Sequence, residues 1–240
     1  MSVVLMVAVL VSGQAMAYTA ELILADWSEA SPLGGWYNIS AGVNAYSGYY
    51  YTDADTINNY LKFNLSSIAP AAGYSLVVNS ATLTIYTAAQ YGPTFSENVY
   101  AVAEDGWTQA SVNYANKPAL GSLLTTVSWP GDWSSFVIAP ASLAAYIQQE
   151  GNGDGVASLG MRAGADCVMV DNMTPRHLFY MGTLESQWFV TKLVVSYSFV
   201  EDPIDFNKDG NHDLKDFAIF AKEWMVCIDP VNINCSKPWE

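Results

Sequence analysis

Short stretches of alternating polar and apolar residues, separated by turn residues, fill positions 18–200 and constrain the fold more than any other feature of the sequence. A period of two puts every second side chain on the same face, which is typical of a β-strand with one face on a core. The stretches are also rich in β-branched and aromatic residues, as strands are. The candidate strands cover residues 61–65, 81–86, 98–102, 134–138 and 192–199.

Turn chemistry separates these candidates, and one helical stretch interrupts them. The turn residues gather at 69–73, 91–93, 129–131 and 151–155. Residues 141–150 follow a proline, place Leu143, Tyr146 and Ile147 on one face and end at a glycine cluster, which predicts a short amphipathic helix. Many short strands with so little helix predict an all-β fold, an antiparallel β-sandwich of the jelly-roll kind, over residues 18–200.

The N-terminus has the pattern of a signal peptide over residues 1–17. An apolar run at 3–11 leads to Ala15, Met16 and Ala17, which form a small-x-small cleavage site. The run is shorter than the roughly 20 residues of a membrane-spanning helix. We therefore expect a secreted or cell-surface protein with no membrane span in its mature form. The alternative is a retained N-terminal segment that packs between subunits.

The charge balance limits the partners of this chain. Nine Lys and Arg residues stand against 23 Asp and Glu residues, a formal net charge of −14. Such a surface repels phosphate backbones and anionic lipids, so nucleic acid is excluded as a partner. It attracts cations instead, and calcium is the abundant divalent cation outside cells.

A change in composition at 201–204 predicts a linker, and a twelve-residue acidic loop follows it. A calcium loop supplies oxygen ligands from positions one, three, five, seven, nine and twelve, and a glycine at position six makes the sharp turn. Gly210 occupies that sixth position. The ligands expected for calcium are the side chains of Asp205, Asn207, Asp209, Asp213 and Asp216 and the backbone carbonyl of Asn211. The alternative is a solvated acidic turn without a metal.

The segment DFNKDGNHDLKDFAIFA at 205–221 resembles a type I dockerin repeat. The resemblance implies an EF-hand-like loop followed by a helix, over residues 205–226, with 227–240 as a C-terminal tail. A working dockerin carries two such repeats, whereas the tail contains no second loop of this spacing. The single repeat is therefore expected to be a vestigial dockerin, a surface-sorting tail or a calcium-rigidified cap.

Several segments of the central region resemble the DNRLRE family, secreted β-sandwich modules related to carbohydrate-binding modules. The matching segments are YLKFNLSSI at 60–68, VNSATLTIY at 78–86, VYAV at 99–102, WTQASVNYANKP at 107–118, LES at 184–186 and TKLVVSY at 191–197. The resemblance implies polysaccharide binding, or a structural module appended to polysaccharide-degrading enzymes and surface proteins.

Aromatic residues in turn-rich surroundings are the candidates for sugar contacts, because sugar rings stack on exposed Trp and Tyr faces. Three consecutive tyrosines cannot all face one core, so at least one of them should be exposed. Trp107, in contrast, is expected in the core. The candidate sugar-binding residues are Trp36, Tyr37, Tyr49, Tyr50, Tyr51, Trp129 and Trp133.

The sequence contains no catalytic motif of a known class. Its two histidines, His177 and His212, stand apart, and no nucleophile elbow, zinc motif or phosphate-binding loop is present. We therefore expect no enzyme and name no catalytic residue. Two alternatives stay open: a structural protein that self-associates into a surface scaffold, and a polysaccharide-active enzyme that uses carboxylates such as Glu97, Glu104 or Asp105. Cys167 is expected to be buried, and Cys227 and Cys235 are close enough in sequence to pair.

Overall fold

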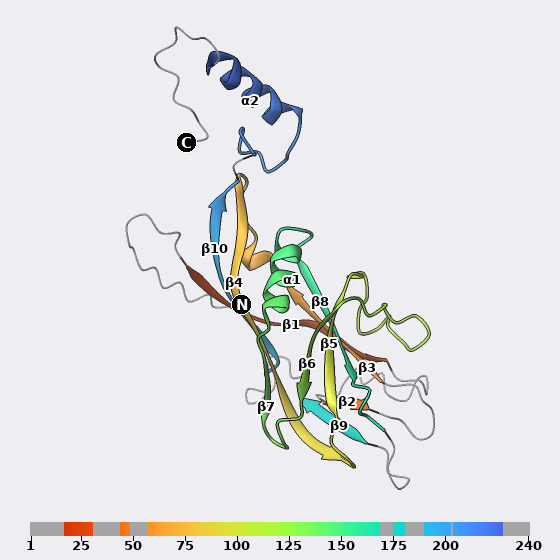
Figure 1. Cartoon of the computed structure of the whole chain (residues 1–240). Coiled ribbons are helices and arrows are strands. Elements are labelled where there is room, and N and C mark those ends of the chain that lie inside the picture. The colour runs from red at the N-terminus through yellow and green to blue at the C-terminus, as the bar shows by residue number, and fades with distance from the viewer. Residues whose placement is uncertain are drawn as a thin grey trace.

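The structure, a computed structural model, describes residues 17–30, 44–48, 57–168, 175–180, 190–202 and 204–227. Figure 1 shows a protein built mainly of antiparallel β-strands, as the alternating pattern predicted. Most of the predicted signal peptide, five of the predicted sugar-binding aromatic residues and the C-terminal tail lie outside the described residues. Those five are Trp36, Tyr37, Tyr49, Tyr50 and Tyr51.

The strands form two sheets that share one strand. The first sheet contains β2 (Asn44–Gly48), β4 (Tyr74–Tyr91), β7 (Ser135–Ile138), β9 (Arg176–Tyr180) and β10 (Lys192–Glu201). The second contains β3 (Asn58–Asn64), β5 (Ser96–Val102), β6 (Leu123–Ser128) and β8 (Val156–Ala163). The shared strand is β1 (Tyr18–Ala30), whose first half pairs with β10 and whose second half pairs with β3.

The long strand β4 organises the first sheet. Its residue Thr84 pairs with β10 on one side and with β7 on the other, and its residue Tyr86 pairs with β9 and β7 in the same way. Strands β9 and β10 therefore follow one another along a single edge of β4. A register shift between Leu24 and Asp26 marks the point where β1 passes from this sheet to the second, and the two sheets face each other as a sandwich.

One large apolar core fills the space between the sheets. Its fully buried side chains include Leu61, Phe63, Leu83, Ile85 and Phe179. The predicted helix is present as α1 (Ala141–Gly151), which packs over β4 and β8 and buries Leu143 and Ile147. Each of the five predicted strands overlaps an observed strand and extends at most one residue beyond it.

A smaller core lies on the outer side of the second sheet, under the connection at residues 103–121. It joins Tyr60 and Val102 to Trp107 and Val112. Trp107 is buried, as predicted, and its indole nitrogen donates a hydrogen bond to Ser158. Cys167 is also buried, as predicted.

The C-terminal unit follows the end of β10 directly. That strand runs to Glu201, one residue into the predicted linker, and the amide of Asp202 still donates to the carbonyl of Gly73. The acidic loop and α2 (Leu214–Cys227) then lie beyond the ends of β4 and β10 (Figure 1). Within the described ranges, no helix has both the length and the apolar character needed to cross a membrane.

Candidate functional site

A cluster of aromatic side chains lies on the outer face of the first sheet. In β9, His177 and Phe179 are fully buried, so the residues that alternate with them point away from the core. Tyr86 on β4 and Tyr46 on β2 likewise lie between fully buried neighbours. We call this set the aromatic face, and it consists of Tyr46, Tyr86, Tyr91, Trp133, Arg176 and Tyr180.

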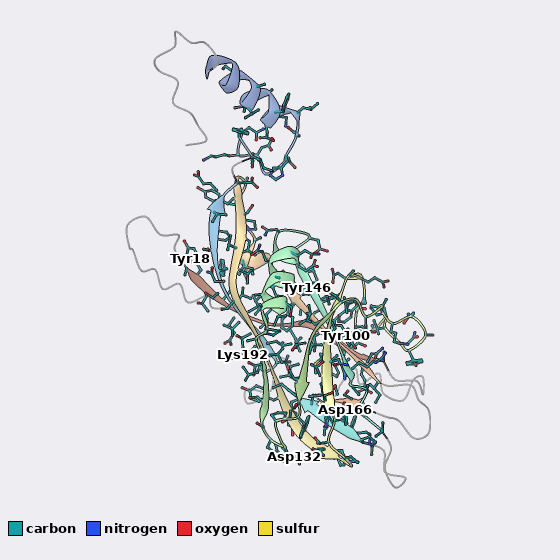
Figure 2. All side chains as sticks on the ribbon, viewed as in Figure 1. Tyr18, Tyr100, Asp132, Tyr146, Asp166 and Lys192 are labelled. Atoms are coloured by element: carbon teal, nitrogen blue, oxygen red, sulfur yellow. The ribbon has the colours of Figure 1, made fainter. Side chains whose placement is uncertain are left out.

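Trp133 is the most exposed aromatic residue among those the structure describes. Its side chain is 68% accessible, and its ring lies 5.8 Å from the ring of Tyr180. Its φ angle is +55°, in the left-handed region that a bulky residue rarely adopts. Figure 2 marks the neighbouring Asp132 at the end of the sheet next to β7. Burial does not account for a tryptophan in this position.

Thr87 on β4 holds the turn that carries Trp133. Its hydroxyl donates to the carbonyl of Gly131 at 2.7 Å and accepts from the amide of Ser134 at 3.0 Å. Its own backbone amide donates to the carbonyl of Ser134 at 3.0 Å. Because Thr87 is fully buried, these three bonds fix the turn from inside the sandwich.

Arg176 forms the other end of the aromatic face. It begins β9 and stands opposite Tyr91, the last residue of β4. Its guanidinium carbon lies 5.5 Å from the ring of Tyr91 and 5.9 Å from the ring of Tyr46. Contacts with two rings hold the guanidinium in place through cation–π attraction. Tyr91 remains 45% accessible.

A buried polar pair lies beneath the aromatic face, inside the sandwich. His177 Nδ1 lies 2.8 Å from Glu97 Oε1, and the hydroxyl of Ser47 donates to Glu97 Oε2 at 2.9 Å. The imidazole is stacked between Phe95 at 3.7 Å and Trp129 at 3.9 Å. Burial raises the pKa of Glu97 to about 8 and lowers the pKa of His177 to about 3. Burial therefore favours the uncharged form of both groups.

The predicted sugar-binding residues that the structure describes have different surroundings. Trp133 is part of the aromatic face. Trp129 is half-buried, and besides His177 it packs edge-on against Phe136 and Phe179. Trp129 therefore lies beneath the aromatic face rather than on its exposed surface.

Sequence reasoning missed Tyr46, Tyr86, Tyr91, Arg176 and Tyr180, although the alternation in 176–180 could have indicated a further strand with Arg176 and Tyr180 outward.

The family model of carbohydrate-binding module family 96 matches residues 43–166, just over half of the chain. The chain belongs to carbohydrate-binding module family 96. The matched residues include Tyr46, Tyr86, Tyr91 and Trp133, whereas β9 follows the match. No curated protein matches the chain.

The family name describes a carbohydrate-binding domain. Two of the carboxylates named as catalytic alternatives, Glu97 and Asp105, have different surroundings in this family 96 module. Glu97 is buried in its pair with His177, whereas Asp105 lies beside Glu150 and Asp154. Oxygens of these last three residues lie within 4.8 Å of one another. Burial and mutual repulsion raise the pKa of Asp105 and of Glu150.

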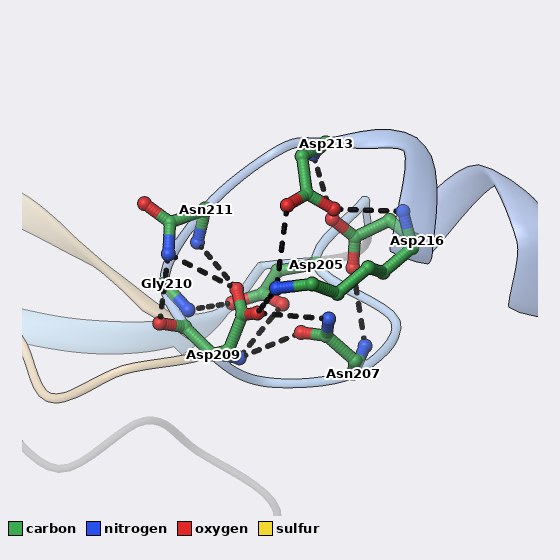
Figure 3. A network of polar contacts seen from close by, with 8 residues as sticks. Asp205, Asn207, Asp209, Gly210, Asn211, Asp213 and Asp216 are labelled. Carbon is green, nitrogen blue, oxygen red and sulfur yellow. Dashed lines mark hydrogen bonds and ion pairs between the residues drawn. The ribbon is translucent and has the colours of Figure 1, made fainter.

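Beyond the family 96 match, the C-terminal acidic loop folds around its own carboxylates (Figure 3). Both oxygens of Asp205 accept backbone amides, from Asp209 at 3.1 Å and from Gly210 at 2.8 Å. Asp216 accepts the amides of Asn207 at 3.1 Å and Asp213 at 2.9 Å. These bonds draw the two ends of the loop together around buried Asp205 and Asp216.

The loop also turns where the spacing predicted. Gly210 has a φ of +82°, a value that suits glycine, and Lys208 has a φ of +57°. The backbone amide of Asn211 and then the ammonium of Lys215 lower the pKa of Asp209. Lys215 Nζ lies 3.2 Å from Asp209 and 3.5 Å from Asp213, so a positive charge already sits against these carboxylates. The side-chain donors predicted for calcium are carboxylate and amide oxygens, the ligands that calcium prefers.

Proposed function

We propose that this protein is a secreted, non-catalytic polysaccharide-binding module of the DNRLRE type with a calcium-binding C-terminal repeat. The observation that carries the binding proposal is Trp133, an exposed ring held in a strained conformation beside Tyr180. A left-handed conformation costs a non-glycine residue about 1–2 kcal/mol. Strain of this kind gathers at functional sites, where a surrounding structure maintains it.

The chemistry of the aromatic face suits a saccharide. The apolar C–H face of a sugar ring stacks on an aromatic ring, and its hydroxyl groups take hydrogen bonds from fixed donors. Trp133 and Tyr180 supply the rings, and Arg176 supplies N–H donors that cannot be lost by deprotonation. The family 96 match supports the same assignment.

The non-catalytic part of the proposal rests on the state of the buried pair. His177 and Glu97 are fully buried and joined to each other, and Ser47 occupies the second carboxyl oxygen. A general base needs a site within hydrogen-bond reach of a substrate proton. This pair is enclosed by Phe95 and Trp129 and so acts as internal support.

The calcium part of the proposal rests on the donor set of the C-terminal loop. Asp205, Asn207, Asp209, Asp213 and Asp216 would supply side-chain oxygens and Asn211 a backbone carbonyl, with calcium replacing the charge of Lys215. Bound calcium would stiffen the loop and cap the end of the sandwich. Export from the cell, implied by the pattern at 1–17, would expose the loop to calcium.

Retention on polysaccharides tests the binding proposal. The purified protein, with and without calcium, is applied to a panel of soluble and insoluble polysaccharides. We expect saturable retention on one polymer class and its loss in Trp133→Ala. Tyr74→Ala is the matched control. Tyr74 is also an exposed aromatic residue, but it begins β4, whereas the aromatic face lies toward the other end of that strand. No retention on any polymer, together with large assemblies in calcium, would favour a self-associating surface protein instead.

A further inference from the structure

The aromatic face has two chemically different ends. Trp133, Tyr86 and Tyr180 form one end, where Tyr86 and Tyr180 are paired across β4 and β9. Arg176, with the rings of Tyr46 and Tyr91, forms the other. The two ends are joined by β9 itself, which begins at Arg176 and ends at Tyr180.

The length of β9 sets the distance between these ends. Strand residues rise about 3.3 Å each, so the four steps from Arg176 to Tyr180 cover roughly 13 Å, the length of about three sugar rings joined in a chain. Between the ends, Leu178 occupies the outward position and is partly exposed. The face is therefore continuous, with apolar surface between two aromatic groups.

From this layout we infer that the module takes an extended saccharide chain lying along β9, with one subsite at Trp133 and Tyr180 and a second at Arg176 and Tyr91. This inference rests on the proposed function and names its ligand as an internal segment of a polymer. A single terminal sugar would contact one end only and would gain nothing from the other.

The two ends would make different contributions. Trp133 is the more exposed ring and stacks on a sugar face in ligands of every length. The second end combines a half-exposed ring, that of Tyr91, with the guanidinium of Arg176, which the flanking rings hold in place. An arginine fixed in this way loses little side-chain freedom when it donates to hydroxyl groups of the ligand. It would act only on ligands long enough to reach it.

Calorimetry with oligosaccharides of defined length tests the inference. The probes are gluco-, manno-, xylo- and galacturono-oligosaccharides of one to six residues. For the series that binds, we expect the affinity to rise at least tenfold between two and four residues and then to level off. Trp133→Ala should weaken binding at every length. Tyr91→Ala should weaken binding of the four-residue ligand about tenfold and leave the two-residue ligand unchanged.

Tyr74→Ala again serves as the control, since Tyr74 and Tyr91 are exposed tyrosines at opposite ends of the same strand. Circular dichroism checks that each variant is folded. An affinity that does not change with ligand length, or a Tyr91→Ala variant that binds all lengths normally, overturns the second subsite while the proposed function stands. Failure of the unmodified protein to bind any oligosaccharide or any polymer overturns the proposed function itself.

Discussion

Nδ1 of His177 lies 2.8 Å from Oε1 of Glu97, and this contact joins the two sheets through the interior of the sandwich. Glu97 comes from β5 in the second sheet, whereas His177 comes from β9 in the first. Ser47, on β2 beside His177, binds the other carboxyl oxygen. Three strands are therefore tied together by one buried carboxyl group directly below the aromatic face.

Loss of this carboxyl group should be costly. Glu97→Ala leaves His177 and Ser47 without their buried partner and also opens a cavity, so we expect a loss of about 3 kcal/mol or more in the free energy of unfolding. Glu97→Gln keeps the shape and an acceptor oxygen, so its loss should be smaller. Urea denaturation measures both variants. Equal stability of Glu97→Ala and the unmodified protein would show that the buried pair does not support the fold.

A second buried carboxyl group makes the stability depend on pH. Glu29 Oε2 accepts a hydrogen bond from the amide of Tyr46 at 2.7 Å, and Asn59 Nδ2 donates one to the carbonyl of Tyr46 at 2.9 Å. These two side chains therefore provide hydrogen-bond partners for the backbone of β2 on its side away from β9. Burial raises the pKa of Glu29 from 4.5 to about 8, as it does for Glu97. Both groups keep a proton in the folded state that the unfolded chain has already released above pH 4.5.

Stability should therefore fall as the pH rises toward about 8, because the unfolded state binds fewer protons. His177 has the opposite effect only below its ordinary pKa of 6.5, since burial keeps it neutral in the folded state. Between about pH 6.5 and pH 8, only Glu29 and Glu97 among these three groups make the free energy of unfolding depend on pH. Urea midpoints measured across this window should fall. Glu29→Gln should make the slope shallower, and Glu104→Gln, at an exposed site, should leave it unchanged.

Two substitutions at Trp133 separate its strain from its function. Glycine tolerates a φ of +55° and alanine does not, so Trp133→Gly should be about 1 kcal/mol more stable than Trp133→Ala. Both variants should lose retention on polysaccharide to the same extent. Thermal unfolding and retention measured side by side check this prediction. Equal stability of the two variants would mean that the turn relaxes and stores no strain.

Removal of the Thr87 hydroxyl group, which lies under the turn that carries Trp133, should weaken polysaccharide binding although Thr87 itself would not contact the ligand. Thr87→Val loses the two hydrogen bonds of the hydroxyl, to the Gly131 carbonyl and from the Ser134 amide, so we expect a loss of about 1–3 kcal/mol in stability and weaker retention on polysaccharide. Thr87→Ser keeps the hydroxyl and should bind normally. If Thr87→Val also bound normally while folded, Trp133 would not need a fixed turn.

Calcium binding should be sensitive to the ammonium group beside the loop. Lys215 pairs with Asp209 and Asp213, so calcium must displace it. Lys215→Met should raise the calcium affinity of the full chain about fivefold, by removing a competing charge. Lys222→Met, on the same helix, is the matched control, and Asp205→Ala should abolish binding. Titration calorimetry measures all three. Equal calcium affinity of Lys215→Met and the unmodified protein would argue against a site at this loop.

The alternating pattern was informative only where one face of a strand meets the core and the other meets water. Strand β4 shows this over 81–86, where Leu83 and Ile85 are fully buried and the residues between them are partly exposed. In β8, five consecutive residues from Ala157 are buried, because the core covers one face and the connection at 103–121 covers the other. A strand covered on both faces does not alternate, so β8 was missed.

The sequence by itself determined the class of the fold, the helix α1 and the spacing of the acidic loop, because each of these depends on residues near one another in the chain. Tertiary structure alone decided the aromatic face and the buried pair. Trp133 meets Tyr180 across 47 positions, and Glu97 meets His177 across 80. Strand pairing sets these contacts, and the register that creates them depends on the packing of the whole core, which no local pattern encodes.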